Sequence, residues 1–102
     1  MGELCDEIEK FGKGIGNASR YKIVEALLKG KKTVGELVAI VGLSQPAISQ
    51  HLKTLKHSSI VTHKRVGQEV FYSINSDYVL TLLKDLALRV QEQKTRNNRR
   101  ET

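Results

Sequence analysis

The sequence predicts a mainly α-helical fold with one β-hairpin, and three observations support this prediction. Its 102 residues, 39% hydrophobic and 27% charged, are enough for one core and too few for several independent domains. Apolar residues recur at helical spacing in five segments. Two β-rich runs lie before the last of these segments. We expect residues 1–93 to form this domain and residues 94–102 to form a basic, polar and disordered tail.

The first two helices are predicted from apolar stripes and a cap. The first carries apolar residues at i, i+4, i+7 and i+11 and is weakened and ended by glycines at 12, 14 and 16. This stripe consists of Leu4, Ile8, Phe11 and Ile15. Asn17 is placed to cap a second helix, which stops at Gly30. The residues of the second helix that we expect to face inward are Tyr21, Ile23, Val24, Leu27 and Leu28.

The third and fourth helices are predicted to be joined by a tight turn. Thr33 and Glu36 have the spacing of a capping box and begin a helix that runs to about Val41. Gly42 can adopt the positive φ that a turn needs, and Ser44 caps the fourth helix. Most short helix pairs are scaffolding. Apolar residues around this turn nevertheless favour a steep angle, as in a helix-turn-helix whose second helix enters a DNA major groove.

The fourth helix has one apolar and one polar face. Ile48, Leu52 and Leu55 share a stripe. The opposite face is polar without being acidic, and it carries Gln45, Ser49, Gln50, Lys53, Lys56 and His57. Such a face suits an anionic partner.

A β-hairpin and a final helix complete the predicted fold. Residues 60–66 and 69–74 are β-rich and meet across Gly67-Gln68, a favourable hairpin turn. Asn75 or Ser76 then caps a helix that is apolar over more than one stripe and must be buried on two sides. We therefore expect the first and last helices to pair with those of a second copy. The residues expected at this dimer interface are Leu4, Ile8, Phe11, Val79, Leu82, Leu83, Leu86 and Val90.

The charge distribution favours a nucleic-acid partner. The formal net charge is +6. Residues 29–68 contain seven basic residues and one acidic residue, and residues 94–102 contain four and one, so these segments carry +6 and +3. The remaining segments, residues 1–28 and 69–93, carry −1 and −2. A basic surplus over the helix-turn-helix and the hairpin favours a polyanion.

The stretch from Leu43 to Leu55, LSQPAISQHLKTL, closely resembles the recognition helix of the ArsR/SmtB family of bacterial winged-helix repressors. The following hairpin is similar to the wing of that family, and the resemblance covers roughly residues 18–74. It implies a winged helix-turn-helix with the order of four helices, a hairpin and a fifth helix. It also implies a homodimeric repressor that places its fourth helices in successive major grooves of a roughly palindromic operator in double-stranded DNA.

The chemistry of the side chains agrees with this resemblance. Amide and hydroxyl groups bond base edges, whereas lysine neutralises phosphates. Ser44 is equally suited to capping the helix, and His51 lies at the edge of the apolar stripe and equally suits a place in the core. Arg65, at the tip of the hairpin, has the reach for a minor groove. The expected DNA-binding residues are Gln45, Ser49 and Gln50 as base readers, Lys53, Lys56, Lys64 and Arg65 as phosphate contacts, and Ser44, His51 and Gln68 beside them.

The sensing sites of the family are not matched, so we expect no metal and no cofactor. Residues 32–35 stand where relatives carry a cysteine pair, and the single cysteine, Cys5, allows neither a disulfide nor a thiolate-rich zinc site. At the metal positions of the last helix stand Ser76, Tyr78, Arg89 and Glu92, which supply at most one good ligand. Positions 25 and 90, which hold cysteines in a thiol-switch subgroup, are glutamate and valine. The effector is unknown.

Several alternatives stay open at this stage. One is a metal or redox sensor that uses Cys5 or the three histidines, and another is a protein-interaction module built on the apolar last helix. RNA binding is less favoured because the aromatic residues fall at core-like positions. We expect no enzyme, because no catalytic constellation is present. We also expect no membrane segment or export signal and a cytoplasmic location in a bacterium or archaeon.

Overall fold

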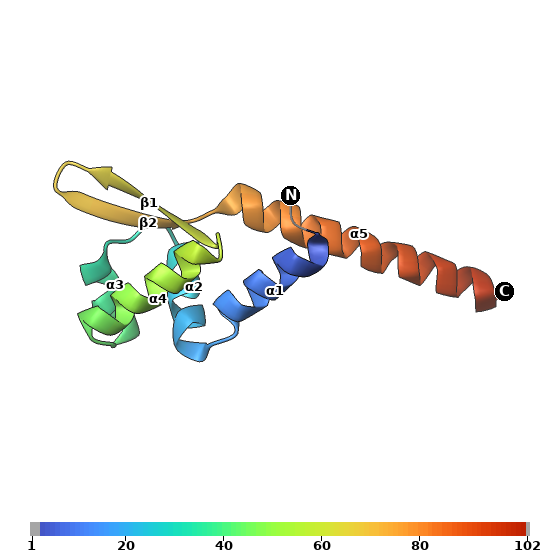
Figure 1. The fold of residues 1–102 in the computed structure, drawn as a ribbon, viewed down its shortest axis with the longest axis horizontal. Coiled ribbons are helices and arrows are strands. Elements are labelled where there is room, and N and C mark those ends of the chain that lie inside the picture. The colour runs from blue at the N-terminus through green and yellow to red at the C-terminus, as the bar shows by residue number, and fades with distance from the viewer. Residues whose placement is uncertain (1–2, 102) are drawn as a thin grey trace.

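The computed structural model describes residues 3–101, with helices on one side of a two-stranded hairpin and a long last helix (Figure 1). Its elements are α1 (Leu4–Ile15), α2 (Ala18–Leu28), α3 (Val34–Val41), α4 (Gln45–His57), β1 (Val61–Val66), β2 (Glu69–Ile74) and α5 (Ser76–Glu101). This order confirms the predicted mainly helical fold with a hairpin wing. Residues 1, 2 and 102, parts of the predicted domain and tail, lie outside the described residues.

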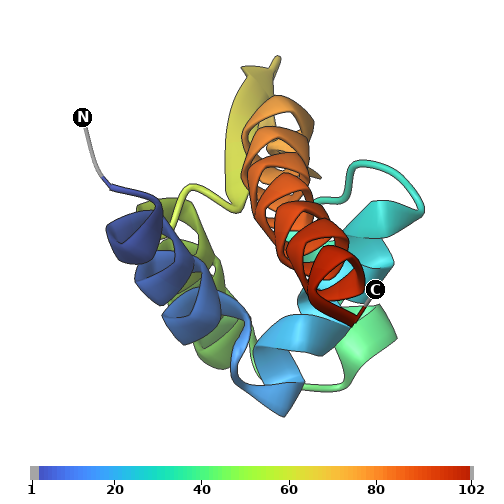
Figure 2. The same ribbon diagram turned by 90° about the vertical axis from the view of Figure 1, so that its right-hand side faces the viewer.

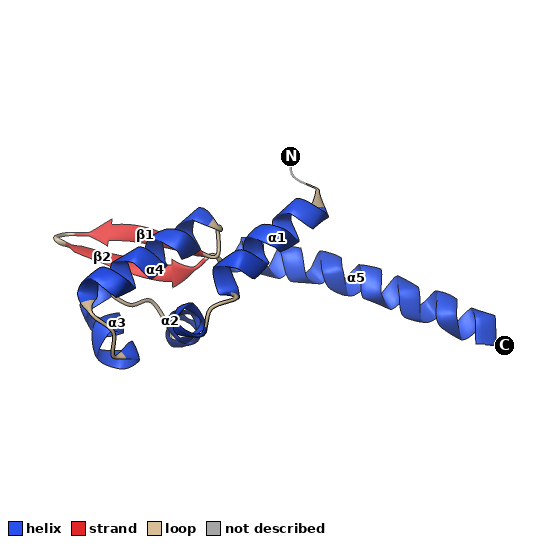
Figure 3. Ribbon diagram, turned by 60° about the horizontal axis from the view of Figure 1, so that its bottom comes forward, coloured by secondary structure: helices blue, strands red, loops and turns tan. Residues whose placement is uncertain are grey.

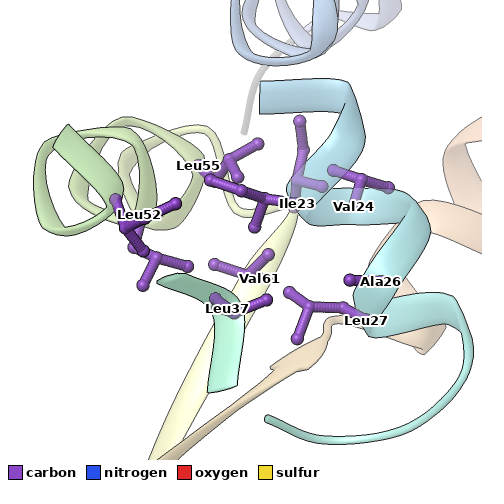
Figure 4. Close-up of a cluster of buried hydrophobic side chains, with 10 residues drawn as sticks. Ile23, Val24, Ala26, Leu27, Leu37, Leu52, Leu55 and Val61 are labelled. Atoms are coloured by element: carbon purple, nitrogen blue, oxygen red, sulfur yellow. The ribbon is translucent and has the colours of Figure 1, made fainter. Parts of the chain in front are cut away.

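The core lies where α2, α3, α4 and β1 meet (Figure 4). Ile23 and Leu37 are fully buried there, and Leu55 and Val61 close the cluster from α4 and β1. The expectation that Tyr21 and other members of its set face inward is wrong at two positions. Tyr21 is 46% exposed and Leu28 is 64% exposed.

The physical reason is the helical period. At about 100° per residue, positions 21 and 28 lie on the side of α2 opposite the stripe of buried residues. Tyr21 is therefore not at a core-like position, and this argument against RNA binding does not hold for it.

The helix ends follow the predicted capping chemistry. The Asn17 side chain accepts a hydrogen bond from the backbone of Arg20 at 3.0 Å and begins α2. At the start of α3, the Thr33 hydroxyl accepts from the Glu36 backbone at 3.2 Å, and the Glu36 carboxylate accepts from the Thr33 backbone at 2.9 Å. Gly42 ends α3 with φ of 82°. The turn between α3 and α4 is thus the tight left-handed one that the sequence predicts.

The hairpin is attached to the helical body through the loop between α2 and α3. β1 and β2 pair antiparallel across a two-residue turn in which Gly67 has φ of 64°. The backbone of Lys32 exchanges two hydrogen bonds with that of Tyr72, at 3.0 and 2.8 Å. In addition, the Lys31 ammonium lies 4.8 Å from the centre of the Phe71 ring. These contacts fix the base of the wing relative to the helix pair.

The tail that the sequence predicts to be disordered is helical as far as residue 101. α5 continues to Glu101 and projects beyond the other elements (Figure 1). With α5 included, the molecule measures 60 Å along its longest axis. Its last turns are rich in Gln, Lys and Arg, residues of good helix propensity. Hydrogen bonds between side chains one turn apart support them, among them Gln93 to Asn97 at 3.2 Å. The side chain of Asn75 does not cap this helix but donates to the Ser59 carbonyl at 3.0 Å.

α1 is held against the body at three points. Gly14 is buried, and an added Cβ would lie 2.7 Å from the Ser58 hydroxyl oxygen. The Arg20 guanidinium donates to the Gly14 carbonyl at 2.6 Å and to the Lys13 carbonyl at 2.9 Å, at the negative end of the helix dipole. The Tyr78 hydroxyl of α5 donates to the Glu7 carboxylate. Figure 2, viewed along α5 from its C-terminal end, shows α1 on one flank of α5.

Candidate nucleic-acid interface

One side of α4 presents polar and cationic groups to solvent. Gln45, Ser49, Lys53 and Lys56 are exposed and follow one another at i, i+4, i+8 and i+11, so they lie along one side of the helix. The stripe of Ile48, Leu52 and Leu55, about a quarter turn around the helix, is buried in the core. Because α4 carries no acidic residue, nothing on this helix repels a phosphate backbone. The arrangement can bond base edges from its first two turns and neutralise phosphates from its last two.

Three other residues predicted to bind DNA, the N-cap and two residues of α4, have different surroundings. The Ser44 hydroxyl accepts from the Ala47 backbone at 3.3 Å and so takes the capping role. His51 is half-buried at the edge of the apolar stripe. Gln50 is exposed, but it lies about 100° around the helix from Ser49 and faces α1. The structure therefore separates Gln50 from the side that carries Gln45 and Ser49.

The hairpin carries its predicted cations on opposite faces. Lys64 is paired with Phe71, and Arg65 is paired with Val70, which places the two cationic side chains on the two different sides of the pleated ribbon. Arg65 shares its face with Tyr72, which packs against the core. Gln68 is exposed in the turn. The structure therefore does not bring Lys64 and Arg65 together, although both lie near the tip.

A groove between α1 and α4 lies next to the exposed side of α4, and we call it the α1–α4 groove. It is lined by Lys10 and Lys13 of α1, by Gln50, Lys53, Thr54 and His57 of α4, and by Ser58. Figure 3 shows α1 and α4 on the same side of the molecule. Sequence reasoning did not select Lys10 or Lys13, because the net charge of residues 1–28 is negative. The signal available was their spacing of three residues, which places both on one helix face.

The residues predicted for the dimer interface fall into two groups. Leu83, Leu86 and Val90 are 42%, 39% and 60% exposed and lie on one stripe of α5. Leu82 is only 5% exposed, so its side chain is already used inside the protomer. The others are half-buried and so partly used within the protomer, namely Leu4, Ile8, Phe11 and Val79. The free apolar surface is therefore on α5.

Among the residues that the structure describes, two side chains have altered pKa values, and both belong to helix contacts. The hydrogen bond to Glu7, followed by burial and by the negative charge of Glu7, raises the pKa of Tyr78 to about 12. The hydrogen bond from the Thr33 backbone lowers the pKa of Glu36. Within the part of the chain that the structure describes, no three His, Cys, Asp or Glu side chains gather where a metal ion could bind. Cys5 is exposed.

Comparison with known proteins decides the family. The sequence model described as "Bacterial regulatory protein, arsR family" matches residues 17–63. The chain is 36% identical to the transcriptional repressor SdpR of Bacillus subtilis over 73 residues, which is 72% of this chain and 77% of SdpR. The chain belongs to the ArsR family. This confirms the resemblance found in the recognition helix and identifies a family of transcriptional regulators rather than enzymes.

Solved structures agree with this ArsR-family fold. HlyU from Vibrio cholerae has a TM-score of 0.72 and 32% identity, and the match covers 84% of this chain and 94% of HlyU. A fragment of Mb0332 from Mycobacterium bovis, described as a homodimeric winged helix-turn-helix DNA-binding domain, has a TM-score of 0.71 and 26% identity, with coverage of 88% and 83%. HlyU is described as a transcriptional activator. This ArsR-family chain spans 60% to 77% of the length of the curated relatives that it matches.

Among the described residues, no helix of this ArsR-family chain has both the length and the apolar character required to cross a bilayer.

Proposed function

We propose that the chain is a sequence-specific transcriptional repressor that binds a roughly palindromic operator as a homodimer. In this proposal α4 enters the major groove, where Gln45 and Ser49 read base edges and Lys53 and Lys56 contact phosphates. The wing adds a further backbone or minor-groove contact through Lys64 or Arg65. Because the proposed partner is chromosomal DNA, the proposed place of action is the cytoplasm.

One observation carries this proposal: the exposed side of α4 combines uncharged hydrogen-bonding groups with cations, on a helix that is held rigid by a buried apolar stripe. The amides and hydroxyls discriminate bases because they donate or accept in fixed directions. The lysines supply affinity that does not depend on sequence. A purely structural helix would need neither the acid-free surface nor the exposed amides.

The proposed dimer rests on the apolar stripe of α5. Leu83, Leu86 and Val90 remain exposed in one protomer. Contact of these apolar side chains with water is unfavourable, so burying them in a dimer would be stabilising. A two-fold axis beside α5 would bury the same stripe from both chains and would hold two copies of α4 a fixed distance apart. A palindromic operator matches this symmetry.

The first experiment defines the operator. Sequences bound by the purified chain are selected from random duplexes, and affinity is then measured by fluorescence anisotropy on the selected duplex and on a scrambled one. With six to ten phosphate contacts per dimer, raising salt from about 50 to 200 mM should weaken binding by roughly 10³- to 10⁵-fold. An affinity that does not depend on salt, or equal affinity for both duplexes, contradicts the proposal.

Substitutions then separate base reading from phosphate contact. Gln45→Ala should reduce the free energy of binding to the operator by about 1–3 kcal/mol, because it removes a base contact. Binding to the scrambled duplex should change little. Lys53→Ala should weaken binding to both duplexes. It should also lower the salt slope, that is, the decrease in log affinity per unit of log salt concentration. Lys22→Ala, which removes one exposed cation from α2, is the control and should bind as the wild type. Equal losses on both duplexes for Gln45→Ala would show that Gln45 does not read bases.

The oligomeric state and the direction of regulation are tested separately. Leu86→Glu should convert the dimer to monomers in sedimentation equilibrium, because the carboxylate would be buried without a partner. Leu88→Glu lies on the other side of α5 and should leave the dimer intact. A promoter that carries the operator should be less active when the chain is present. Higher promoter activity in the presence of the chain would show that it acts as an activator instead.

A further inference from the structure

We infer that the α1–α4 groove binds the sugar-phosphate backbone of the same DNA duplex, so that Lys10 and Lys13 of α1 add phosphate contacts beside the recognition helix. This inference rests on the proposed DNA-binding function and adds a contact surface to it. The two added side chains, Lys10 and Lys13, belong to α1 and so lie outside the helix-turn-helix and the wing.

The position of α1 in this groove is fixed by close packing. Around the buried Gly14, an added Cβ would meet the Ile60 side chain and the Ser58 hydroxyl oxygen, each at 2.7 Å. The Arg20 guanidinium also ties the last turn of α1 to α2. Lys10 and Lys13 are therefore held on a rigid helix next to α4, and only their side chains must be ordered when a ligand binds. A rigid scaffold lowers the entropy cost of each contact.

The charge in the groove is unbalanced. Lys10 and Lys13 face Lys53 across it, with His57 beside them, and no Asp or Glu is among the lining residues. Glu9 approaches Lys13 at 3.5 Å, but both side chains are highly exposed, so this pair offsets little of the charge. Cations gathered in a concave surface produce a positive potential that attracts a polyanion. The groove has a volume of about 480 Å³, so it has ample room for a phosphate group.

The location of the groove identifies DNA as the occupant. Lys53 belongs both to the exposed side of α4 and to the groove, and Gln50 links the two surfaces. A helix in the major groove lies between the phosphates of the two strands, because the groove is only about 12 Å wide. The phosphates on the α1 side of α4 would then meet Lys10 and Lys13. Gln50, which faces α1, would contact the backbone rather than the bases.

The test compares two double variants that remove the same charge. Lys10→Gln with Lys13→Gln should lower the salt slope by about 0.9 for each lost contact, or about 1.8 when each protomer of a dimer loses one. At 0.1 M salt this corresponds to roughly eightfold weaker binding per contact. The control, Lys22→Gln with Lys29→Gln, changes two exposed lysines of the α2 face and should keep the wild-type slope and affinity. Far-UV circular dichroism and thermal unfolding check that all variants fold, and Lys10→Gln alone provides a milder version.

Ethylation interference locates the contact on the DNA. Ethylation of one or two operator phosphates should interfere with binding of the wild type. It should not affect binding of the groove variant further, because that variant has already lost the contact. A groove variant with the wild-type salt slope and the wild-type interference pattern would overturn the inference, and so would an equal loss in the α2 control. If the wild-type chain binds no duplex at all, the proposed function itself fails.

A second arm separates DNA from a small anion. Inorganic phosphate is added in place of chloride at constant ionic strength. If millimolar phosphate releases the operator from the wild type and not from the groove variant, while both bind the operator equally well without it, the groove is an anion site and the inference of a backbone contact is overturned. Equal effects of phosphate and chloride, with weaker binding by the groove variant, support the backbone contact.

Discussion

The packing of α1 makes a sharp prediction about two glycines of the same helix. Gly12→Ala adds a methyl group that meets nothing within 4 Å, whereas Gly14→Ala adds one that would lie 2.7 Å from the Ile60 side chain and 2.9 Å from Ser58 Cβ. Alanine improves helix propensity at both positions, and the gain at Gly14 is the smaller one because Gly14 lies in the last turn of α1. Their difference in stability therefore measures the closeness of α1 to the segment between α4 and β1.

The magnitudes follow from the contacts. Alanine in place of glycine stabilises a helix interior by about 0.5–1 kcal/mol, so Gly12→Ala should raise the free energy of unfolding by that amount. Carbon atoms pack best at about 3.5–4.0 Å, so the new methyl at position 14 must move its neighbours by roughly 0.8 Å or more. Such overpacking costs about 1–3 kcal/mol. Gly14→Ala should therefore be about 1–3 kcal/mol less stable than Gly12→Ala.

The assay is urea and thermal unfolding followed by far-UV circular dichroism. All proteins are compared at one concentration, because association shifts apparent stability. In a domain of this size each kcal/mol changes the Tm by about 4–8 °C, so the two variants should be well separated. If Gly14→Ala were as stable as Gly12→Ala, α1 would not be packed as described, and the rigid placement of Lys10 and Lys13 beside α4 would lose its basis.

Three further predictions concern the contacts that hold the helices. Arg20→Ala removes two hydrogen bonds to the C-terminal carbonyls of α1 and should lower stability by about 1–2 kcal/mol in urea unfolding, against no change for the exposed control Lys22→Ala. One tyrosine should ionise with a pKa of about 12 in a phenolate absorbance titration, and Glu7→Gln should bring this value down toward the ordinary one of about 10, because the hydrogen bond to the carboxylate favours the protonated phenol. The capping carboxylate of Glu36 has a lowered pKa, so its contribution is present at neutral pH and is lost as the pH falls through that lowered value. Glu36→Gln keeps a capping group, and its unfolding should depend less on pH in the acid range than that of the wild type.

Much of the fold could be predicted because its signals are local. The cap at Asn17, the capping box at Thr33 and the left-handed turn at Gly42 each depend on residues within one turn of the chain. The hairpin register follows from a turn of two residues. The prediction that Tyr21 is buried was wrong because apolar character marks a helix without marking its buried side. The prediction of a disordered tail rests on its polar composition. That composition does not reveal that the tail continues a stable helix.

The sequence by itself determined the element order, the helix ends and the acid-free surface of α4, since these depend on neighbouring residues and on helical period. Only the tertiary structure decided how α1 lies against α4, that Gly14 permits this contact, and that Lys10 and Lys13 lie beside Lys53. The same structure placed Lys64 and Arg65 on opposite faces of the wing and left one stripe of α5 exposed. The physical reason is that packing between segments distant in the chain depends on the shapes of several surfaces at once, which no local pattern of residues encodes.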